Sequence, residues 1–294
     1  MFLAGIDGGG TSTKLELRDM DNRLIRREKF GPFNINSIGE PAFRELMAKV
    51  FAACGDMADC ASLCVGAAGI SNPRLRTVME EELAKAGFAG RFLLVGDQEI
   101  ALRGAMDTPG IALIAGTGSI AFGRNAAGET ARSGGYGHLI DDGGSGYALG
   151  RDALSAVVRA LDGRGKETAL TKAVFDLLNI SSLAEIVTFV YGKDTDKSKI
   201  ARISLTVAEC AGAGDEAALE ILRRGAEELA QLVAAVQRKL NLGTCPIALL
   251  GGLLEMENPY RAEVAAVLNA LGTPMAPAHD ALWGAAQMAF ELLK

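Results

Sequence analysis

Residues 3–14 read Leu-Ala-Gly-Ile-Asp-Gly-Gly-Gly-Thr-Ser-Thr-Lys, and this stretch decides the fold. Its apolar run predicts a buried strand that ends at Asp7. A turn of glycines and hydroxyl residues follows, formed by Gly8, Gly9, Gly10, Thr11, Ser12 and Thr13. Glycines let backbone N–H groups come close to an anion, and an acid beside them suits a divalent cation. We therefore predict a site for the phosphates of a metal–nucleotide complex, with the metal on Asp7.

Two common phosphate motifs do not describe this turn. The pattern GxxxxGK[ST] is missing, and Thr13 occupies the third glycine position of a dinucleotide fingerprint. A strand, rather than the helix of that fingerprint, is expected after the turn. The alternative to a phosphate site is an ordinary glycine-rich hairpin.

Length and composition narrow the class of protein. With 294 residues, the chain exceeds the size at which one core usually divides, so we expect two domains. Its net charge of −6 disfavours nucleic acid and anionic membranes as partners. No apolar run reaches the ~18–20 residues of a membrane span, and no signal peptide is visible. Five cysteines without a CxxC pair predict reduced thiols and a cytoplasmic location.

Hydrophobic periodicity predicts a repeated design. The first hundred residues suggest strands over 2–7, 14–18, 24–30, 61–67 and 91–95, with helices over 40–54, 74–86 and 98–106. A second unit opens with a strand over 111–115, the turn Gly116-Thr117-Gly118-Ser119 and a strand over 120–124. Later segments suggest a long helix over 217–240, a strand over 246–250 that ends at Gly251-Gly252, and helices over 259–271 and 280–293. Two copies of strand, glycine turn and strand predict duplicated domains that face each other across a cleft.

Several motifs resemble those of a known superfamily, in its order. Residues 5–11 resemble the first phosphate motif of the actin-like ATPase and sugar-kinase superfamily, 113–119 its second, and 247–252 its adenosine motif. More narrowly, residues 134–146 resemble a stretch of N-acetylglucosamine kinases and their BadF/BadG-type relatives, and 280–286 their closing helix. The resemblance implies an α/β fold of two ribonuclease H-like domains, each a mixed five-stranded sheet with flanking helices. It places residues 1–109 with the C-terminal helix 280–294 in one lobe and 110–279 in the other.

The same resemblance implies the roles of individual residues, with ATP and Mg²⁺ as cofactors. Asp97, which follows a strand and precedes a helix, would take the proton from the 6-hydroxyl of a sugar; alternatively it only caps that helix. Phosphate and adenosine contacts would come from both glycine turns and from Gly251 and Gly252. Sugar contacts would come from Asn34, Asn36, Asp97, Thr117, Gly118, Gly135, Tyr136 and Asp142. The alternatives are a polar loop for the two asparagines and a surface turn for Asp142.

Three departures from the family pattern fall around the sugar. Asp141-Asp142-Gly143 stands where Gly-Asp-Glu is usual, Tyr136 replaces a tryptophan, and Ala67-Ala68-Gly69 offers no hydroxyl. They leave open whether the sugar is N-acetylglucosamine or glucosamine. The additional carboxylate of Asp141 suggests a free amine, hence glucosamine, as a hypothesis.

Three functions compete at this point. The first is an ATP-dependent amino-sugar kinase, expected as a homodimer with a small sugar substrate. The second is an ATPase that activates a dehydratase or reductase, which would need cysteines to hold an iron–sulfur cluster. The third is a sugar-sensing regulator, which the acidic charge and the absence of a preceding DNA-binding helix-turn-helix disfavour.

Overall fold

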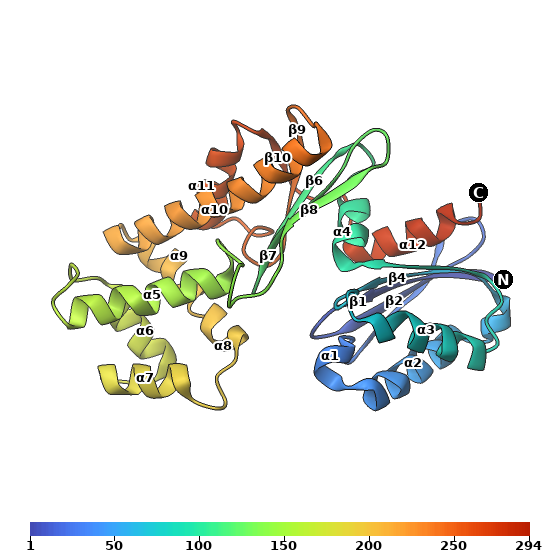
Figure 1. The fold of residues 1–294 in the computed structure, drawn as a ribbon, viewed down its shortest axis with the longest axis horizontal. Helices are drawn as coiled ribbons and strands as arrows, with labels where there is room; N and C mark the ends of the chain where they lie inside the picture. The colour runs from blue at the N-terminus through green and yellow to red at the C-terminus, as the bar shows by residue number, and fades with distance from the viewer. The chain divides into compact units, whose positions relative to one another are not determined.

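The computed structural model describes residues 1–294 and divides into two compact units (Figure 1). The first unit comprises residues 1–108 and 277–294, so the chain leaves it once and returns. The second unit comprises residues 109–276. Each unit is built around one mixed five-stranded sheet, which confirms the predicted fold class.

The first sheet has the strand order β3-β2-β1-β4-β5. Its strands are β1 (Phe2–Gly8), β2 (Thr13–Arg18), β3 (Leu24–Phe30), β4 (Cys60–Ala67) and β5 (Arg91–Gly96). The first three form an antiparallel meander, whereas β4 pairs parallel with both β1 and β5. Central β1 is covered on both faces, which explains its unbroken apolar run.

Helices cover both faces of this sheet. On one side lie α2 (Glu40–Cys54) and α3 (Pro73–Lys85), whose apolar residues share a core with β1 and β2. On the other lie α4 (Asp97–Ala105) and α12 (Ala281–Glu291). A Cβ on Gly5 would lie 2.4 Å from the backbone nitrogen of Ala286, so only glycine lets α12 pack this closely on β1. Two short elements, α1 (Ile35–Ile38) and the 3₁₀ helix η1 (Met57–Asp59), complete the unit.

The second sheet has the order β10-β9-β6-β7-β8. Its strands are β6 (Gly110–Ala115), β7 (Ser119–Arg124), β8 (Thr130–Gly134), β9 (Cys245–Leu250) and β10 (Gly272–Met275). The helix predicted over 259–271 is wrong at its end, because α11 (Pro259–Leu268) stops and the chain enters β10. This strand has only four residues and contains a proline, so it carries almost no strand signal of its own.

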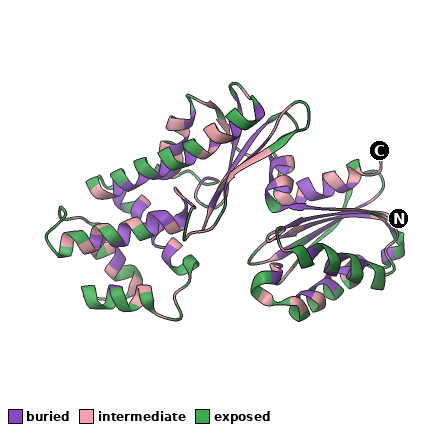
Figure 2. Cartoon of the chain, viewed as in Figure 1, coloured by how far each residue is buried: buried purple, intermediate pink, exposed green.

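A helical layer separates β8 from β9 in sequence. It contains α5 (Gly146–Leu161), α6 (Leu170–Leu178), α7 (Leu183–Tyr191), α8 (Lys197–Ala201), α9 (Ser204–Gly212) and α10 (Glu216–Leu240). Leu222, Leu229, Val233 and Val236 recur at helical spacing on α10 and are buried. Figure 2 shows the buried faces of these helices turned toward one another and toward the sheet.

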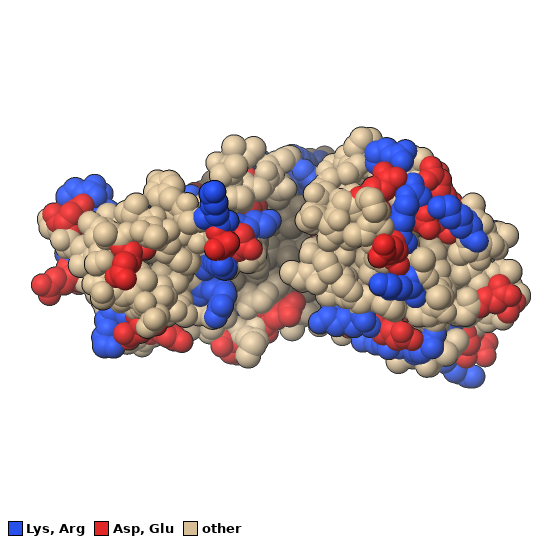
Figure 3. All heavy atoms as spheres, turned by 90° about the horizontal axis from the view of Figure 1, so that it is seen from below, with Lys and Arg blue, Asp and Glu red and all other residues tan.

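Surface charge and hydropathy add two observations. Basic and acidic side chains are interspersed on the face seen in Figure 3. No single helix has both the length and the apolar composition needed to cross a bilayer. Helices α6 and α7 meet that criterion only as a pair, and they are bent by 56° relative to each other.

Candidate functional site

The first glycine turn has a packed base and an open tip. A Cβ on Gly8 would lie 2.5 Å from the ring of Phe33, and the Gly9 N–H donates to the carbonyl of Ser12 at 3.0 Å. At the tip, Gly10 and Thr11 are exposed, and a Cβ on Gly10 would meet nothing within 4 Å. The tip therefore leaves room for an anion to approach the backbone.

Thr13 does not belong to that open tip. It is fully buried, and its hydroxyl donates to the carbonyl of Gly31 at 2.8 Å. The side chain therefore ties the start of β2 to the loop after β3, which corrects the expectation that it faces a ligand. Gly8 also lies in the packed base, where it serves close packing against Phe33.

Two carboxylates meet at one edge of the first sheet. The register pairs Gly8 with Ala67 and Ala67 with Gly96, so β1, β4 and β5 end together. Asp7 lies near the end of β1, and Asp97 follows β5 directly. The side chain of Asp7 is 15% exposed, and its Oδ2 accepts from the Lys14 Nζ at 3.0 Å. The carboxyl ends of parallel strands are where functional groups of α/β sheets collect.

Asp97 is the first residue of α4 and not its cap. Gly96 occupies the N-cap position, and its N–H donates to the Glu99 carboxylate at 3.0 Å. Asp97 as a whole residue is exposed, but its carboxyl group lies among protein atoms and accepts from the Gln98 N–H at 3.0 Å in a partly buried hydrogen bond. Surrounding protein displaces water from this carboxyl group and raises its pKa, and the negative charge of Asp7 raises it further. A raised pKa at a carboxylate is typical of a proton acceptor in catalysis.

The residues present here fit a magnesium ion. Mg²⁺ is held through one or two carboxylates together with substrate phosphates and water. Asp7 supplies one carboxylate beside a turn whose exposed backbone can approach phosphate oxygens. The Lys14 Nζ donates to the Asp7 Oδ2 at 3.0 Å and competes with a metal for the same oxygen.

A cluster of asparagines lies beside this edge. The Asn34 Oδ1 accepts from the Asn36 backbone N–H at 3.0 Å, and the Asn36 Oδ1 accepts from the Asn72 Nδ2 at 2.6 Å. Gly69 has a φ of +81°, and a Cβ there would lie 2.8 Å from the Asn34 Oδ1. Asn72 was not among the residues predicted from the sequence, although Asn-Pro directly before a helical pattern marks a helix start.

The second glycine turn rests on a loop that comes from later in the chain. The Ser119 hydroxyl donates to the carbonyl of Gly143 at 2.8 Å, and its backbone N–H donates to the Asp142 Oδ1 at 3.3 Å. Ser119 is buried, so it anchors this loop instead of facing a ligand, which corrects its predicted role. Gly116, Thr117 and Gly118 remain half-buried at the surface of the turn.

Asp142 is a buried carboxylate in a left-handed backbone conformation. Its side chain is only 4% exposed and its φ is +64°, so the alternative of a surface turn acid is wrong. Burial raises the pKa of this carboxyl group, and nearby Asp141 adds to the rise, whereas the Ser119 N–H lowers it. A Cβ on Gly118 would lie 2.9 Å from the Asp142 Oδ2, so the turn and the acid are in direct contact.

The loop between β8 and α5 places the remaining predicted sugar residues. Gly135 has a φ of +76°, and Tyr136 is 60% exposed beneath the guanidinium of Arg132, 4.7 Å from its ring. The Asp141 Oδ2 accepts from the Tyr136 N–H at 3.1 Å. Asp141 thus closes its own loop, which weakens the hypothesis that it binds a free amine.

Gly251 lies at the end of β9, beside the second turn. Its φ is +87°, and a Cβ there would lie 2.4 Å from the carbonyl oxygen of Ala115. The Leu253 N–H donates to that same carbonyl at 3.2 Å. Gly252 is exposed and has open space around it. The structure thus brings Gly251 and Gly252 to the strand end where the second turn begins.

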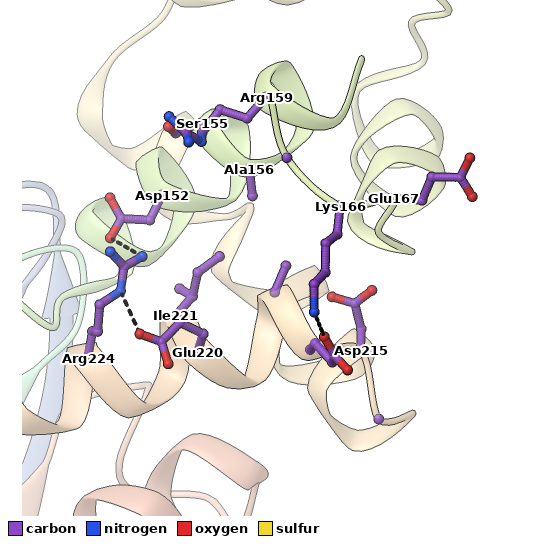
Figure 4. Close-up of a pocket in the computed structure, with 14 residues that line it drawn as sticks. Asp152, Ser155, Ala156, Arg159, Lys166, Glu167, Asp215, Glu220, Ile221 and Arg224 are labelled. Carbon is purple, nitrogen blue, oxygen red and sulfur yellow. Dashed lines mark hydrogen bonds and ion pairs between the residues drawn. The ribbon is translucent and has the colours of Figure 1, made fainter. Parts of the chain in front are cut away.

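A cavity of the second unit lies elsewhere. It measures about 760 Å³ and is formed by α5, the loop after it and the start of α10 (Figure 4). None of the predicted site residues lines it. Its acids are largely paired, as in Lys166 with Glu216 and Arg224 with Asp152. We therefore place the candidate site at the glycine turns.

Comparisons with known proteins agree with these motifs. The model of the BadF/BadG/BcrA/BcrD ATPase family matches residues 4–289. An N-acetylmuramic acid/N-acetylglucosamine kinase of Clostridium acetobutylicum is 33% identical over 276 residues, which cover 91% of this chain and 90% of the relative. An N-acetyl-D-glucosamine kinase of Dictyostelium discoideum is 29% identical and covers 85% of each chain. The crystal structure of a candidate N-acetylglucosamine kinase from Chromobacterium violaceum has a TM-score of 0.76 and 28% identity, over 100% of this chain and 99% of that one.

Proposed function

Because the chain belongs to the BadF/BadG/BcrA/BcrD ATPase family, we propose that it is an amino-sugar kinase that transfers the γ-phosphate of ATP to the 6-hydroxyl of N-acetylglucosamine or glucosamine. The observation that carries the proposal is the meeting of Asp7, Asp97 and the open glycine turn at one sheet edge. Phosphoryl transfer needs alignment and charge neutralisation, which a glycine turn with a metal carboxylate supplies, and a base for the acceptor hydroxyl.

Each residue of the first unit has a distinct role in this proposal. Asp97 accepts the proton of the 6-hydroxyl, and its raised pKa strengthens it as a base. Asp7 holds Mg²⁺, which would neutralise charge on the β- and γ-phosphates. Backbone N–H groups at the tip of the turn, from Gly10 to Ser12, bind phosphate oxygens.

The second unit supplies the remaining contacts. The proposed nucleotide contacts are Gly116, Gly251 and Gly252; a Cβ on Gly116 or Gly252 would meet nothing within 4 Å, which leaves room for a ligand. The proposed sugar contacts are Thr117, Gly118, Gly135, Tyr136 and Asp142, together with Asn34 and Asn36 of the first unit. Thr13 and Ser119 support the two turns from within, as their buried hydrogen bonds indicate.

The proposal includes a homodimer in the cytoplasm, a compartment that suits five unpaired, buried cysteines. Sedimentation of the purified chain tests the dimer. A monomer that phosphorylates sugar would remove the dimer from the proposal and leave the chemistry in place.

One assay tests the central claim. ADP release from ATP and Mg²⁺ is measured with glucosamine, N-acetylglucosamine, N-acetylmuramic acid and glucose, and the product is analysed by NMR for phosphorus coupling at C6. We expect an amino sugar to stimulate ADP release and a 6-deoxy analogue not to. If no sugar stimulates release and Asp97→Asn changes nothing, the kinase function is wrong.

The same purified protein can be used to distinguish the kinase from the two other candidate functions. An activator with an iron–sulfur cluster would absorb visible light under anaerobic conditions and hydrolyse ATP without forming a sugar phosphate. Cys210 and Cys245, the cysteines of the second unit, are 7% and 8% exposed within its core. A sugar-sensing regulator would bind the sugar without turnover.

A further inference from the structure

A chain of two hydrogen bonds fixes how the side chains of Asn72 and Asn36 are oriented. The Asn72 Oδ1 accepts from the Arg74 backbone N–H at 2.8 Å, which caps α3. A backbone N–H can only donate, so the other end of the Asn72 amide must be its NH₂ group. That group donates to Asn36 at 2.6 Å, so the Asn36 atom it reaches must be the oxygen.

The groups that Asn36 and Asn34 leave outside these hydrogen bonds are therefore their NH₂ groups, which are donors. With its Oδ1 turned to Asn72, Asn36 leaves its Nδ2 without a protein acceptor, and its side chain is exposed. Asn34 is fixed in the same way, because its Oδ1 accepts from the Asn36 backbone N–H at 3.0 Å. Gly69 lies against both amides, as a Cβ there would be 2.8 Å from the Asn34 Oδ1 and 3.1 Å from the Asn36 Nδ2.

These amides lie close to the catalytic edge of the first sheet. Gly69 follows Ala67 by two residues, and Ala67 is paired with Gly8 on one side and Gly96 on the other. The Ala68 N–H also donates to the carbonyl of Gly8 at 2.8 Å. The asparagines thus border the place where the first glycine turn and Asp97 meet.

We infer that Asn72 is a positioning residue that makes Asn36 present a hydrogen-bond donor to the sugar, so that the site selects an N-acyl amino sugar over a free amino sugar. The inference rests on the proposed function and specifies its substrate. A carbonyl oxygen only accepts hydrogen bonds and so matches a donor, whereas the ammonium group of glucosamine only donates and would face a second donor. Asp141, the residue that suggested a free amine, is held in its own loop, where its Oδ2 accepts from the Tyr136 N–H.

Two substitutions at residue 72 change the hydrogen bond to Asn36 while keeping the cap of α3, so that an effect on the orientation of Asn36 can be distinguished from an effect on folding. Asn72→Asp keeps an oxygen to cap α3 but replaces the donor with an acceptor, so Asn36 turns over and presents its oxygen. Asn72→Ser also keeps a capping oxygen, because serine caps helices about as well as asparagine, but it only removes the bond to Asn36. Both variants should therefore fold, and they differ in what Asn36 presents.

We expect the wild-type KM to be at least about tenfold lower for N-acetylglucosamine than for glucosamine. In Asn72→Asp the KM for N-acetylglucosamine should rise about tenfold, with kcat and the KM for ATP nearly unchanged, so that the preference largely disappears. Asn72→Ser should give a smaller rise, of about threefold or less. An equal rise for both sugars, or a larger rise in Asn72→Ser than in Asn72→Asp, would overturn the inference.

A second measurement does not depend on turnover. In protein labelled with ¹⁵N at asparagine, the side-chain amide signals of residues 34, 36 and 72 are assigned by substitution and followed as each sugar is added. N-acetylglucosamine should shift the Asn36 signal in the wild type and not in Asn72→Asp. If the sugar shifts other signals and leaves Asn36 unmoved, the inference is wrong while the kinase function stands. If no sugar shifts any signal or is phosphorylated, the proposed function itself is wrong, and the inference with it.

Discussion

The two sheets share one topology but differ in where their acidic residues lie relative to the glycine turn. In each unit an antiparallel meander comes first, and two parallel strands are added next to its first strand. Each meander opens with a glycine turn. In the first unit, Asp7 lies on the strand that enters the turn, and Asp97 follows β5. In the second unit, Ala115 ends the entering strand, and the acid at the turn is Asp142, from a loop beyond the meander.

This difference separates two kinds of carboxylate chemistry. Asp97 is exposed and free to meet a substrate proton. Asp142 is 4% exposed and holds the N–H of Ser119 beneath its turn. In the proposed function, the duplicated turn provides backbone donors in both units, whereas the proposed catalytic base belongs to the first unit alone. If the comparison is correct, replacing the acids at the first turn should act on catalysis, and replacing the acid at the second turn should act on sugar affinity.

The largest effect is expected from Asp97→Asn. Losing a positioned base should lower kcat by about 10²–10⁴-fold, measured by coupled ADP release. Folding should not suffer, because asparagine keeps an oxygen for the Gln98 N–H. The raised pKa of Asp97 means that the folded state binds its proton more tightly than the unfolded state does. The ionised form is therefore destabilising near neutral pH, and removing the charge should not lower the Tm.

The control for this substitution is Asp107→Asn. Asp107 lies just beyond α4 and pairs with Arg103 on the surface, so its loss should leave kcat unchanged. An Asp97→Asn variant with kcat within threefold of the wild type would remove the base from the mechanism.

The next largest effect concerns Asp7, its metal and its charge. Asp7→Asn should raise the Mg²⁺ concentration needed for half-maximal rate by about tenfold, because a carboxylate ligand is lost. It also removes a charge that raises the pKa of Asp97. Since activity requires ionised Asp97, kcat/KM should fall on the acid side with an apparent pKa above the ordinary ~3.9 of aspartate, and this limb should move to lower pH in Asp7→Asn.

Lys14→Met should change the Mg²⁺ concentration needed for half-maximal rate in the opposite direction. It frees the Asp7 Oδ2 from the lysine ion pair, so the Mg²⁺ requirement should fall, by about twofold to threefold. An unchanged requirement in both variants would place the metal elsewhere.

The sequence predicted what depends on local pattern. Both glycine turns, the first meander, the first two strands of the second and the long α10 follow from apolar periodicity and from glycines at fixed places. The resemblance then singled out Asp97 and Asp142. The sequence did not show that Thr13 and Ser119 are consumed by buried hydrogen bonds, because their acceptors, Gly31 and Gly143, are distant in the chain.

Asn72 was missed for a related reason. Its capping role is readable from Asn-Pro, but its bond to Asn36 joins residues on two separate loops. The burial of Asp142 is likewise a property of packing, since its own neighbours in sequence are glycine and acid and would suit an exposed turn. Strand β10 lacks any local signal and forms because β9 offers it a free edge.

A smaller effect is expected from Asp142→Asn, and on affinity more than on rate. Asparagine tolerates the left-handed conformation and can still accept from the Ser119 N–H, so the loop should keep its shape. Losing the charged acceptor should raise the KM for the amino sugar by about tenfold and change kcat by less than threefold. Burial raises the pKa of Asp142, so neutralising it should leave the Tm at pH 7 equal or higher. A fall in kcat without a change in KM would show that the two units do not divide the work in this way.

The smallest effect should come from the backbone of the second turn, and two neighbouring glycines form a matched pair. A Cβ on Gly118 would lie 2.9 Å from the Asp142 Oδ2, whereas a Cβ on Gly116 would meet no protein atom within 4 Å. Gly118→Ala must therefore displace the Asp142 carboxylate, and we expect it to raise the KM for the sugar about threefold, the order of a weakened hydrogen bond. Gly116→Ala should leave that KM unchanged, and any loss should appear in the KM for ATP, because the added methyl group can only meet a ligand. If the two variants raised the sugar KM equally, the contact between the second turn and its buried acid would not control sugar binding.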